Sequence, residues 1–211
     1  MFEDIIVYFS QNSSQYWTAV WEHLSISLLA LLIALLIGLP LGYLSWQLPL
    51  IRRISQGSIQ ALRVIPSLGI LFILIPIIGV GRGPALIALV ILGLPAILLN
   101  TVVGFQEVSP VLVETGIGLG MTQWQLLFRV QLPLALPHIL NGIKLALVEV
   151  IASATLATYI GAGGLGEIIF TGLGLYRLDL LVIGGGSVAV LSFLTMIIFD
   201  FTIKGVTSHE I

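Results

Sequence analysis

The fold is decided by the stretch Glu114-Thr-Gly-Ile-Gly-Leu-Gly-Met-Thr-Gln-Trp-Gln-Leu-Leu-Phe-Arg-Val-Gln-Leu-Pro133, which separates long apolar runs on either side. Ser109-Pro110, just before it, supplies an N-cap residue and a proline at the first helical position, so we expect a short helix from residue 110. This helix should carry Glu114 and end among the glycines at 116, 118 and 120, because glycine suits a helix C-cap. The stretch therefore predicts a short helix followed by a glycine turn.

A second short helix should begin at Thr122. Gln125 follows three residues later, which completes a capping box. Pro133 and Pro137 should end this helix, because the residue before a proline is disfavoured in the α region. Residues three or four positions apart share one face of a helix, and here that face is apolar. It consists of Trp124, Leu127 and Phe128.

The composition indicates that lipid is the solvent of this chain. Of its 211 residues, 58% are hydrophobic and 9% are charged, and the mean hydropathy is +1.14. A soluble domain carries roughly 25% charged residues, so this chain cannot cover a water-facing surface. The net charge of −2 lacks the basic footprint of a nucleic-acid-binding protein. Cysteine is absent, and the three histidines are far apart in sequence, so no metal site is predicted.

The apolar runs predict an all-α, polytopic membrane helix bundle of five spans, with residues 1–211 as one domain. About 20 apolar residues cross the ~30 Å hydrocarbon layer. The runs lie at about 24–46, 61–80, 84–105, 139–160 and 180–203. Pro66 and Pro76 interrupt the second run. In the first run, Gly38-Leu-Pro-Leu-Gly42 predicts either a close helix contact or only a proline bend.

The residues before the first span lack the basic start of a signal peptide, so we expect that span to be retained. Four apolar residues in this segment could form one face of a short helix on the membrane surface. They are Phe2, Ile5, Ile6 and Phe9. A frayed terminus is the alternative.

Five spans place the two termini on opposite sides of the membrane, and the basic residues decide the orientation. One orientation puts six basic residues inside and two outside, in agreement with the positive-inside tendency. The six are Arg52, Arg53, Arg63, Arg129, Lys144 and Lys204, and the two are Arg82 and Arg177. The N-terminus is then outside, the C-terminus is cytoplasmic, and the loop of about 107–138 faces the cytoplasm.

Polar residues within the spans are candidates for the lining of a translocation pathway. Glu149 lies about ten residues into the fourth run, which is ~15 Å along a helix and near the middle of the hydrocarbon layer. A charge there costs at least ~2.5 kcal/mol, so it should face the bundle or a partner subunit. Ser153 extends the same face, and Asn100 is a weaker candidate. A protonated carboxyl buried between helices is the alternative for Glu149. Asp200 and Lys204 are a candidate structural ion pair.

The segment Gly161-Ala-Gly-Gly-Leu-Gly166 matches the pattern G-x-G-x-x-G. We reject a dinucleotide site because that motif needs a preceding strand, and a membrane helix precedes it here. Non-helical backbone at membrane depth survives only against protein or a watery cavity, so the segment is interpreted as an outer gate, with a merely flexible loop as the alternative. The gate residues are Gly161, Gly163, Gly164 and Gly166. The sequence holds no P-loop, Ser/His/Asp arrangement or paired-carboxylate motif, so we expect no enzyme activity in this chain.

The spacing in residues 114–133 resembles the cytoplasmic loop of permease subunits of bacterial ABC importers. In that family the loop reads Glu-Ala-Ala, three residues, Gly, nine residues, a β-branched residue, any residue, Leu-Pro. Thr115 and Gly116 stand where the family has alanines, and Gly116 should loosen the first helix by up to ~1 kcal/mol. The resemblance implies the type I importer permease fold. It also implies docking on an ATPase through Glu114, Gly120, Met121, Thr122, Trp124, Leu127 and Phe128.

Further stretches resemble the osmoprotectant (glycine betaine, carnitine, choline) branch of this superfamily. They include Ile65-Pro-Ser-Leu68, Leu94-Pro-Ala-Ile97, Asn100-Thr101 and Tyr159-Ile-Gly-Ala-Gly-Gly-Leu-Gly166. Leu99 departs from the pattern, since these permeases often carry arginine before the Asn-Thr pair.

The resemblance implies the membrane-spanning subunit of an ATP-driven importer in the bacterial cell membrane, carrying a small quaternary ammonium solute. The implied partners are cytoplasmic ABC ATPases that bind ATP and Mg, a second permease subunit, identical or related, and an external solute-binding protein. No cofactor is expected in this chain and no nucleic acid among its partners. One alternative is a permease for another small solute such as methionine. A stand-alone channel or secondary transporter is the other.

Overall fold

All regular elements in the described part of the chain are helices. The computed structural model describes residues 2–207, without the side chains at positions 56, 58, 60 and 63. The longer helices are α1 (Phe2–Gln47), α2 (Pro49–Val64), α3 (Ser67–Ile78), α4 (Arg82–Gln106), α7 (Leu132–Ala157) and α9 (Leu178–Thr207). The short ones are α5 (Pro110–Gly118), α6 (Gln123–Leu126) and α8 (Gly166–Gly174), with a π-helical turn at Leu127–Gln131 and a 3-10 turn at Thr158–Ile160. The all-α prediction is confirmed.

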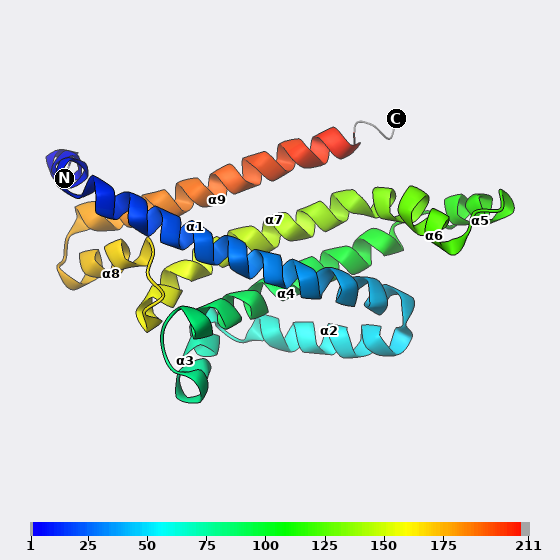
Figure 1. The fold of residues 1–211 in the computed structure, drawn as a ribbon, viewed down its shortest axis with the longest axis horizontal. Helices are drawn as coiled ribbons and strands as arrows, with labels where there is room; N and C mark the ends of the chain where they lie inside the picture. The colour runs from blue at the N-terminus through cyan, green and yellow to red at the C-terminus, as the bar shows by residue number, and fades with distance from the viewer. Residues whose placement is uncertain (1, 208–211) are drawn as a thin grey trace.

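The helices run back and forth along one long axis (Figure 1). α1 leads from the N-terminus to the opposite end, α2 and α3 return towards the middle, and α4 runs out again to the hairpin of α5 and α6. α7 leads back to α8, and α9 runs outward once more. We call the two ends of the molecule the N-terminal end, which includes α8, and the hairpin end, which holds α5 and α6. The C-terminal end of α9 points towards the hairpin end.

Among the described residues, four helices are long and apolar enough to cross a membrane: α1, α4, the continuous helix Gln123–Ile160 that contains α7, and α9. The predicted second span, 61–80, is interrupted at Pro66 as expected, but Pro76 lies inside the 12-residue helix α3, which is too short to count as a fifth long span. Ile65 has an extended backbone (φ −75°, ψ 122°), as expected when a proline ring crowds the α conformation of the preceding residue. Two helices therefore make the return between α1 and α4.

The N-terminal segment is helical from Phe2, which disagrees with the frayed-terminus alternative. Asn12 leaves the helical region (φ −122°, ψ 20°), and the first turns of α1 lie at an angle to the rest (Figure 1). Phe2 and Ile6 are exposed, whereas Ile5 packs against the core of the bundle. The placement of this short helix on a membrane surface stays a prediction.

Small residues let α1 approach α4 closely. A β-carbon added at Gly42 would lie 2.6 Å from Cβ of Thr101, and one at Gly38 would lie 2.8 Å from Cγ2 of Ile97. Pro40 lies inside the continuous helix between these two contacts. Of the two interpretations of this segment, the close helix contact is therefore the one that the structure shows.

Glycine also brings α4 and α7 together. A β-carbon at Gly142 of α7 would lie 2.6 Å from Cβ of Asn100 and 2.9 Å from the carbonyl oxygen of Ala96. The amide of Asn141 donates a hydrogen bond to Oδ1 of Asn100 at 3.2 Å. Close backbone approach and side-chain hydrogen bonds are the usual means of helix association in lipid, where apolar burial between helices gives little driving force.

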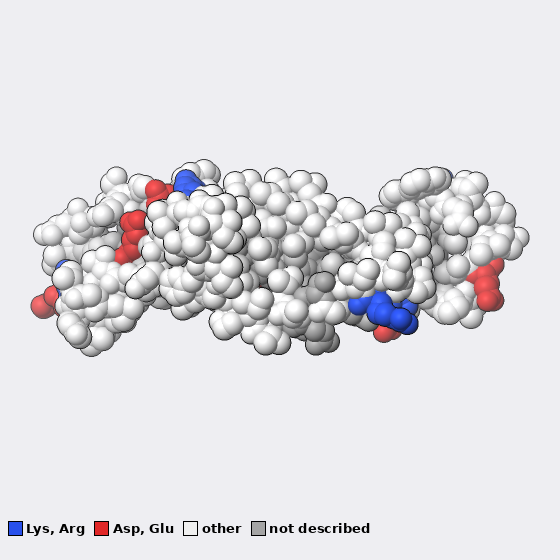
Figure 2. Space-filling model, turned by 90° about the horizontal axis from the view of Figure 1, so that it is seen from below, with Lys and Arg blue, Asp and Glu red and all other residues white. Residues whose placement is uncertain are grey.

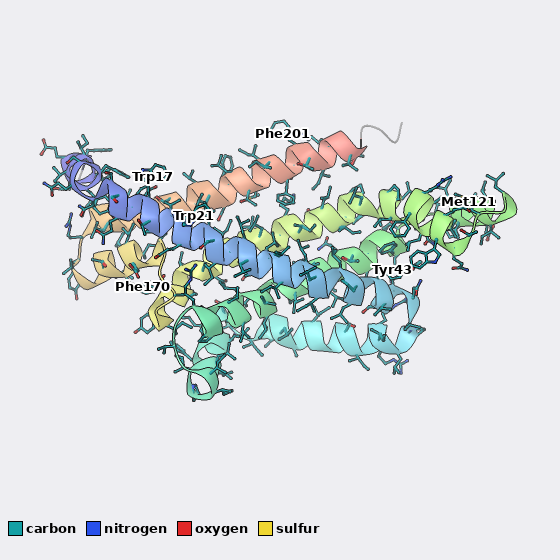
Figure 3. The ribbon with its side chains drawn as sticks, in the orientation of Figure 1. Trp17, Trp21, Tyr43, Met121, Phe170 and Phe201 are labelled. Atoms are coloured by element: carbon teal, nitrogen blue, oxygen red, sulfur yellow. The ribbon has the colours of Figure 1, made fainter. Side chains whose placement is uncertain are left out.

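Aromatic side chains mark two levels along α1 (Figure 3). Trp17 and Trp21 lie towards the N-terminal end and are 65% and 72% exposed. Tyr43 lies towards the other end of α1, where its ring contacts those of Trp46 and Phe105 at centroid distances of 5.8 and 5.2 Å. At ~1.5 Å per residue, Trp21 and Tyr43 are ~33 Å apart, close to the hydrocarbon thickness. Aromatic residues are enriched at both membrane interfaces, so this spacing supports a transmembrane α1.

Charged side chains agree with this placement. On the face in Figure 2, acidic and basic groups gather towards the two ends of the molecule, and most of the described surface between them is drawn white, without charged residues. Such a belt is expected of a protein whose middle is immersed in lipid.

The close contact between α4 and α7 predicts that a methyl group added at Gly142 lowers the stability of the protein. Gly142→Ala should destabilise the protein by about 1–3 kcal/mol, the usual cost of overpacking, because the added carbon meets the backbone of α4. Gly186→Ala in α9 is the matched control: its β-carbon meets nothing within 4 Å, and alanine favours a helix. Thermal unfolding of the two purified variants in detergent measures the difference. Unfolding of Gly142→Ala at or above the wild-type temperature would contradict this packing.

Candidate functional site

The α5–α6 hairpin is built around two glycines. Gly120 has φ +77°, a left-handed conformation that glycine adopts without strain, so the predicted turn is present. The backbone N–H of Met121 donates to the carbonyl of Gly116 at 3.1 Å and closes the end of α5. Gly116 is buried, and a β-carbon there would lie 2.8 Å from Cδ1 of Leu126. Leu126 thus fills the space of a methyl group, which explains why glycine stands here where alanine is usual.

The two helix starts of the hairpin differ in how they are capped. At α6, Thr122 Oγ1 accepts from the Gln125 N–H at 3.3 Å, and Gln125 Oε1 accepts from the Thr122 N–H at 2.8 Å. The predicted capping box is therefore confirmed. At α5, Pro110 begins the helix as predicted, but Ser109 makes no side-chain cap bond. Glu114, on α5, is exposed.

The predicted apolar face of the second helix divides between two surroundings. Trp124 and Phe128 stack with ring centroids 5.8 Å apart and an interplanar angle of 10°, and they are 71% and 57% exposed. Leu127 is half-buried instead and packs against the cluster that contains Phe105 and Ile139. The exposed apolar surface is thus a stacked aromatic pair, and Leu127 anchors the hairpin to the bundle.

The prediction that Pro133 and Pro137 end the second helix is wrong. The chain continues from α6 through the π-helical turn into α7, and Pro137 lies inside α7. Pro133 lies in the first turn of α7, where the N–H of Leu132 donates to the carbonyl of Leu127, five residues earlier. A proline ring clashes with the carbonyl four residues before it, and the wider π turn relieves that crowding. α6, the π-helical turn and α7 therefore form one continuous helical rod, to which α5 is joined by the glycine turn.

A second group of candidates lies in the middle of the bundle. A cavity of about 540 Å³, which we call the central cavity, opens between α2, α3, α4 and α7, with Glu149 and Asn100 in its wall. Glu149 is exposed on the single chain and accepts a hydrogen bond from Ser153 Oγ at 3.3 Å. Ser153 is buried, so it orients the carboxylate. The roles of these three residues stay predictions.

The predicted ion pair at the hairpin end has a different partner. Asp200 of α9 accepts from Lys144 Nζ of α7 at 2.7 Å, so the bond joins two helices and the pairing with Lys204 is not the one observed. Sequence spacing along one helix could not reveal this contact, because the two residues are 56 positions apart.

The glycine segment at the N-terminal end is non-helical, as predicted. Gly161, Gly163 and Gly164 have φ between +79° and +93°, and Gly166 begins α8, a short helix that the sequence did not suggest. A β-carbon on Gly166 would clash with the carbonyl of Thr155. The segment is therefore packed against protein, in disagreement with a merely flexible loop. Its role as a gate stays a prediction.

Two charged residues that sequence reasoning left without a role border this segment. Glu22 Oε2 accepts from the backbone N–H of Gly164 at 3.1 Å, and Arg82 donates to Oγ of Ser25 at 2.8 Å. Both line a second cavity of about 540 Å³, the N-terminal cavity. The sequence did contain one indication of these two residues, because Glu22 and Arg82 each lie at the edge of an apolar run.

Comparison with known proteins decides the family. The family model described as the inner membrane component of binding-protein-dependent transport systems matches residues 30–208. The chain belongs to this family. It is 44% identical over 89% of its length to the carnitine transport permease protein OpuCB of Listeria monocytogenes, covering 86% of that protein. It is 35% identical over 96% of its length to the glycine betaine/carnitine/choline transport system permease protein OpuCB of Bacillus subtilis, covering 94% of that protein.

Solved structures agree with the fold. This family member superposes with a TM-score of 0.78 and 26% identity on a chain of the inward-facing MetNI methionine ABC transporter, covering 90% of this chain and 94% of that one. An amino acid ABC transporter crystallised with histidines gives a TM-score of 0.79 at 18% identity, covering 94% and 97% of the two chains, which supports the fold alone. The chain therefore has the fold of ABC importer permeases, and it is an inner membrane component of a transport system.

Proposed function

We propose that this permease forms part of the pathway of an ATP-driven importer and couples it to a separate cytoplasmic ATPase through the α5–α6 hairpin. The observation that carries the proposal is the exposed, stacked pair of Trp124 and Phe128 on a rigid hairpin at one extreme of the bundle. Burial of apolar surface at an interface favours association by ~25 cal/mol per Å² removed from water. Aromatic residues are also frequent interface anchors. ATP and Mg then bind the ATPase, and this chain needs no cofactor of its own.

The solute that we propose is a small quaternary ammonium compound such as carnitine, glycine betaine or choline. Relatives named for the transport of these compounds are between 35% and 44% identical over 89% or more of this chain. The methionine transporter shares the fold at 26% identity. The higher identity over a similar length favours the quaternary ammonium class.

We also propose a second permease subunit, identical or related, and an external binding protein. Glu149 supports the second subunit: it is exposed on the single chain although it lies about ten residues into the predicted span 139–160, near the middle of the hydrocarbon layer. Contact of a carboxylate with lipid at that depth would cost at least ~2.5 kcal/mol, so a partner or a watery pathway should face it. The binding protein is supported by the description of the family.

The orientation that we propose has the hairpin end in the cytoplasm and the N-terminal end outside. The N–H of Gly81 donates to the carbonyl of Ile160 at 2.6 Å, so the two turns lie at the same end of the bundle. Reporter fusions after Arg53 and Met121 should therefore give cytoplasmic signals, and fusions after Gly81 and Leu173 should give external ones. A cytoplasmic signal after Gly81 would contradict this orientation.

The coupling role predicts that two variants of the hairpin lose coupling to the ATPase. Trp124→Ala should weaken docking of the ATPase by about 2 kcal/mol, or roughly 30-fold, because a large exposed anchor is removed. Gly120→Val should also reduce coupling, because valine is strained at φ +77°. Co-purification of the ATPase and transport-coupled ATP hydrolysis measure both effects, while insertion into the membrane should stay intact.

Glu149→Gln is the contrasting variant. It lies in the central cavity, away from the hairpin, so it should alter transport while the ATPase still co-purifies. If Trp124→Ala and Gly120→Val keep the ATPase and full coupled activity, the hairpin is only a connector and the proposed coupling is wrong. Loss of the assembled complex in Glu149→Gln would instead assign that residue a structural role.

A further inference from the structure

The N-terminal cavity lies where five parts of the chain meet. Its wall contains residues of α1, the start of α4, the glycine segment, α8 and the start of α9. Its volume of about 540 Å³ falls within the ~300–1,000 Å³ of small-molecule sites. The cavity borders the glycine segment at the C-terminal end of the rod that carries Glu149 and the hairpin. A small solute bound here would therefore sit at one end of the proposed pathway.

The acidic side of the cavity is built with fixed geometry. Glu22 is half-buried and accepts a hydrogen bond from the backbone of Gly164. A β-carbon on Gly163 would lie 2.5 Å from Oε2 of Glu22, so only glycine leaves room for this carboxylate. Glu167, exposed in the first turn of α8, adds a second carboxylate to the same wall.

The basic side of the cavity is provided chiefly by Arg82. Its guanidinium donates to the hydroxyl of Ser25, which is a neutral partner. Arg177 also lines the cavity, but it donates to both carboxylate oxygens of Asp179 at 3.2 and 2.5 Å. The hydrogen bond to Asp179 raises the pKa of Arg177, and this ion pair already occupies its guanidinium. The wall thus offers carboxylates and an arginine whose hydrogen-bond partner is a neutral hydroxyl.

We propose that the N-terminal cavity binds a small zwitterion that carries a quaternary ammonium group and a carboxylate. The inference rests on the proposed function and names the part of the permease that meets the solute. A quaternary ammonium group has no N–H to donate, so it is attracted by charge and by aromatic faces, which Glu22, Glu167 and the half-buried Tyr8 supply in this wall. A carboxylate accepts strong, charge-assisted hydrogen bonds from a guanidinium, which Arg82 supplies.

If this arrangement is used, the acidic and the basic residues of the cavity should affect the binding of different solutes. Glycine betaine and carnitine have both groups, whereas choline has the cation and no carboxylate. Arg82 should therefore contribute to the binding of the zwitterions alone, and Glu22 should contribute to the binding of all three. A cavity that merely receives a side chain of the binding protein would show no such discrimination.

The experiment uses the permease assembled with its ATPase in lipid nanodiscs, without binding protein. Binding of radiolabelled glycine betaine and choline is measured by equilibrium dialysis. Arg82→Gln should weaken glycine betaine binding by about tenfold to a hundredfold, the range for loss of one charge-assisted hydrogen bond, and should not weaken choline binding, because it removes a positive charge from the wall. Glu22→Gln should weaken both, while its amide oxygen can still accept from Gly164. Arg53→Gln, at the other end of α1–α2, is the control and should change neither.

The outcomes separate this inference from the proposed function. Equal losses of both ligands in Arg82→Gln would overturn the zwitterion site, and so would no loss of either. If Glu22→Gln perturbs the structure, Glu167→Gln, on an exposed side chain, gives the same test of the acidic side. An absence of solute binding in a wild-type complex that still transports with its binding protein would overturn the cavity site and leave the permease function standing. A wild-type complex without ATP-dependent transport would contradict the proposed function itself.

Discussion

The close contact between α4 and α7 is the constraint on which the rest of the structure depends. In lipid, helices gain little from burying apolar surface against each other, so they are held by close approach and by hydrogen bonds. Gly142 admits the backbone of α4, Gly104 would place a β-carbon 2.8 Å from the carbonyl of Ala135, and Asn141 donates to Asn100 across the same interface. These contacts hold the two helices whose ends carry the functional regions: α4 begins at Arg82 and leads to the hairpin, and α7 joins the hairpin to the glycine segment.

Continuity of the helical rod links the two ends of the molecule. The chain stays helical from α6 through the π-helical turn and Pro133, so α6 is attached to α7 by a helix and not by a loop. Leu127 packs at this junction against the cluster of Phe105, Ala135 and Ile139. A displacement of the stacked aromatic pair by an ATPase would therefore move α7 along its length. The central cavity lies along that helix, and the glycine segment follows it. This geometry gives the proposed coupling a physical route.

Local chemistry in the sequence was sufficient for most of the fold. The capping box of Thr122, the left-handed glycine at position 120 and the non-helical glycine segment all follow from interactions within a few residues, and each is present. Contacts between distant residues were beyond such reasoning: the Lys144–Asp200 ion pair and the packing of Leu127 against the cluster that contains Phe105 depend on which helices become neighbours. The prediction that the helix ends at Pro133 was wrong for another reason. A π turn allows a proline to be accommodated within a helix, and nothing in the residue spacing indicates where a π turn forms. In the candidate site, Glu149 and Asn100 could be predicted because they are polar residues within apolar runs. Glu22 and Arg82 could not, because only the three-dimensional structure shows that they line the same cavity.

The central claim is that the hairpin end of the bundle meets an ATPase in the cytoplasm. Its most direct test is photo-crosslinking from position 124, with benzoylphenylalanine in place of Trp124, in the permease co-expressed with its ATPase. The account predicts a crosslink between the two proteins, and none from the same amino acid in place of Phe72, an exposed residue of α3. Crosslinks from position 124 that reach only lipid or the permease itself would contradict the account.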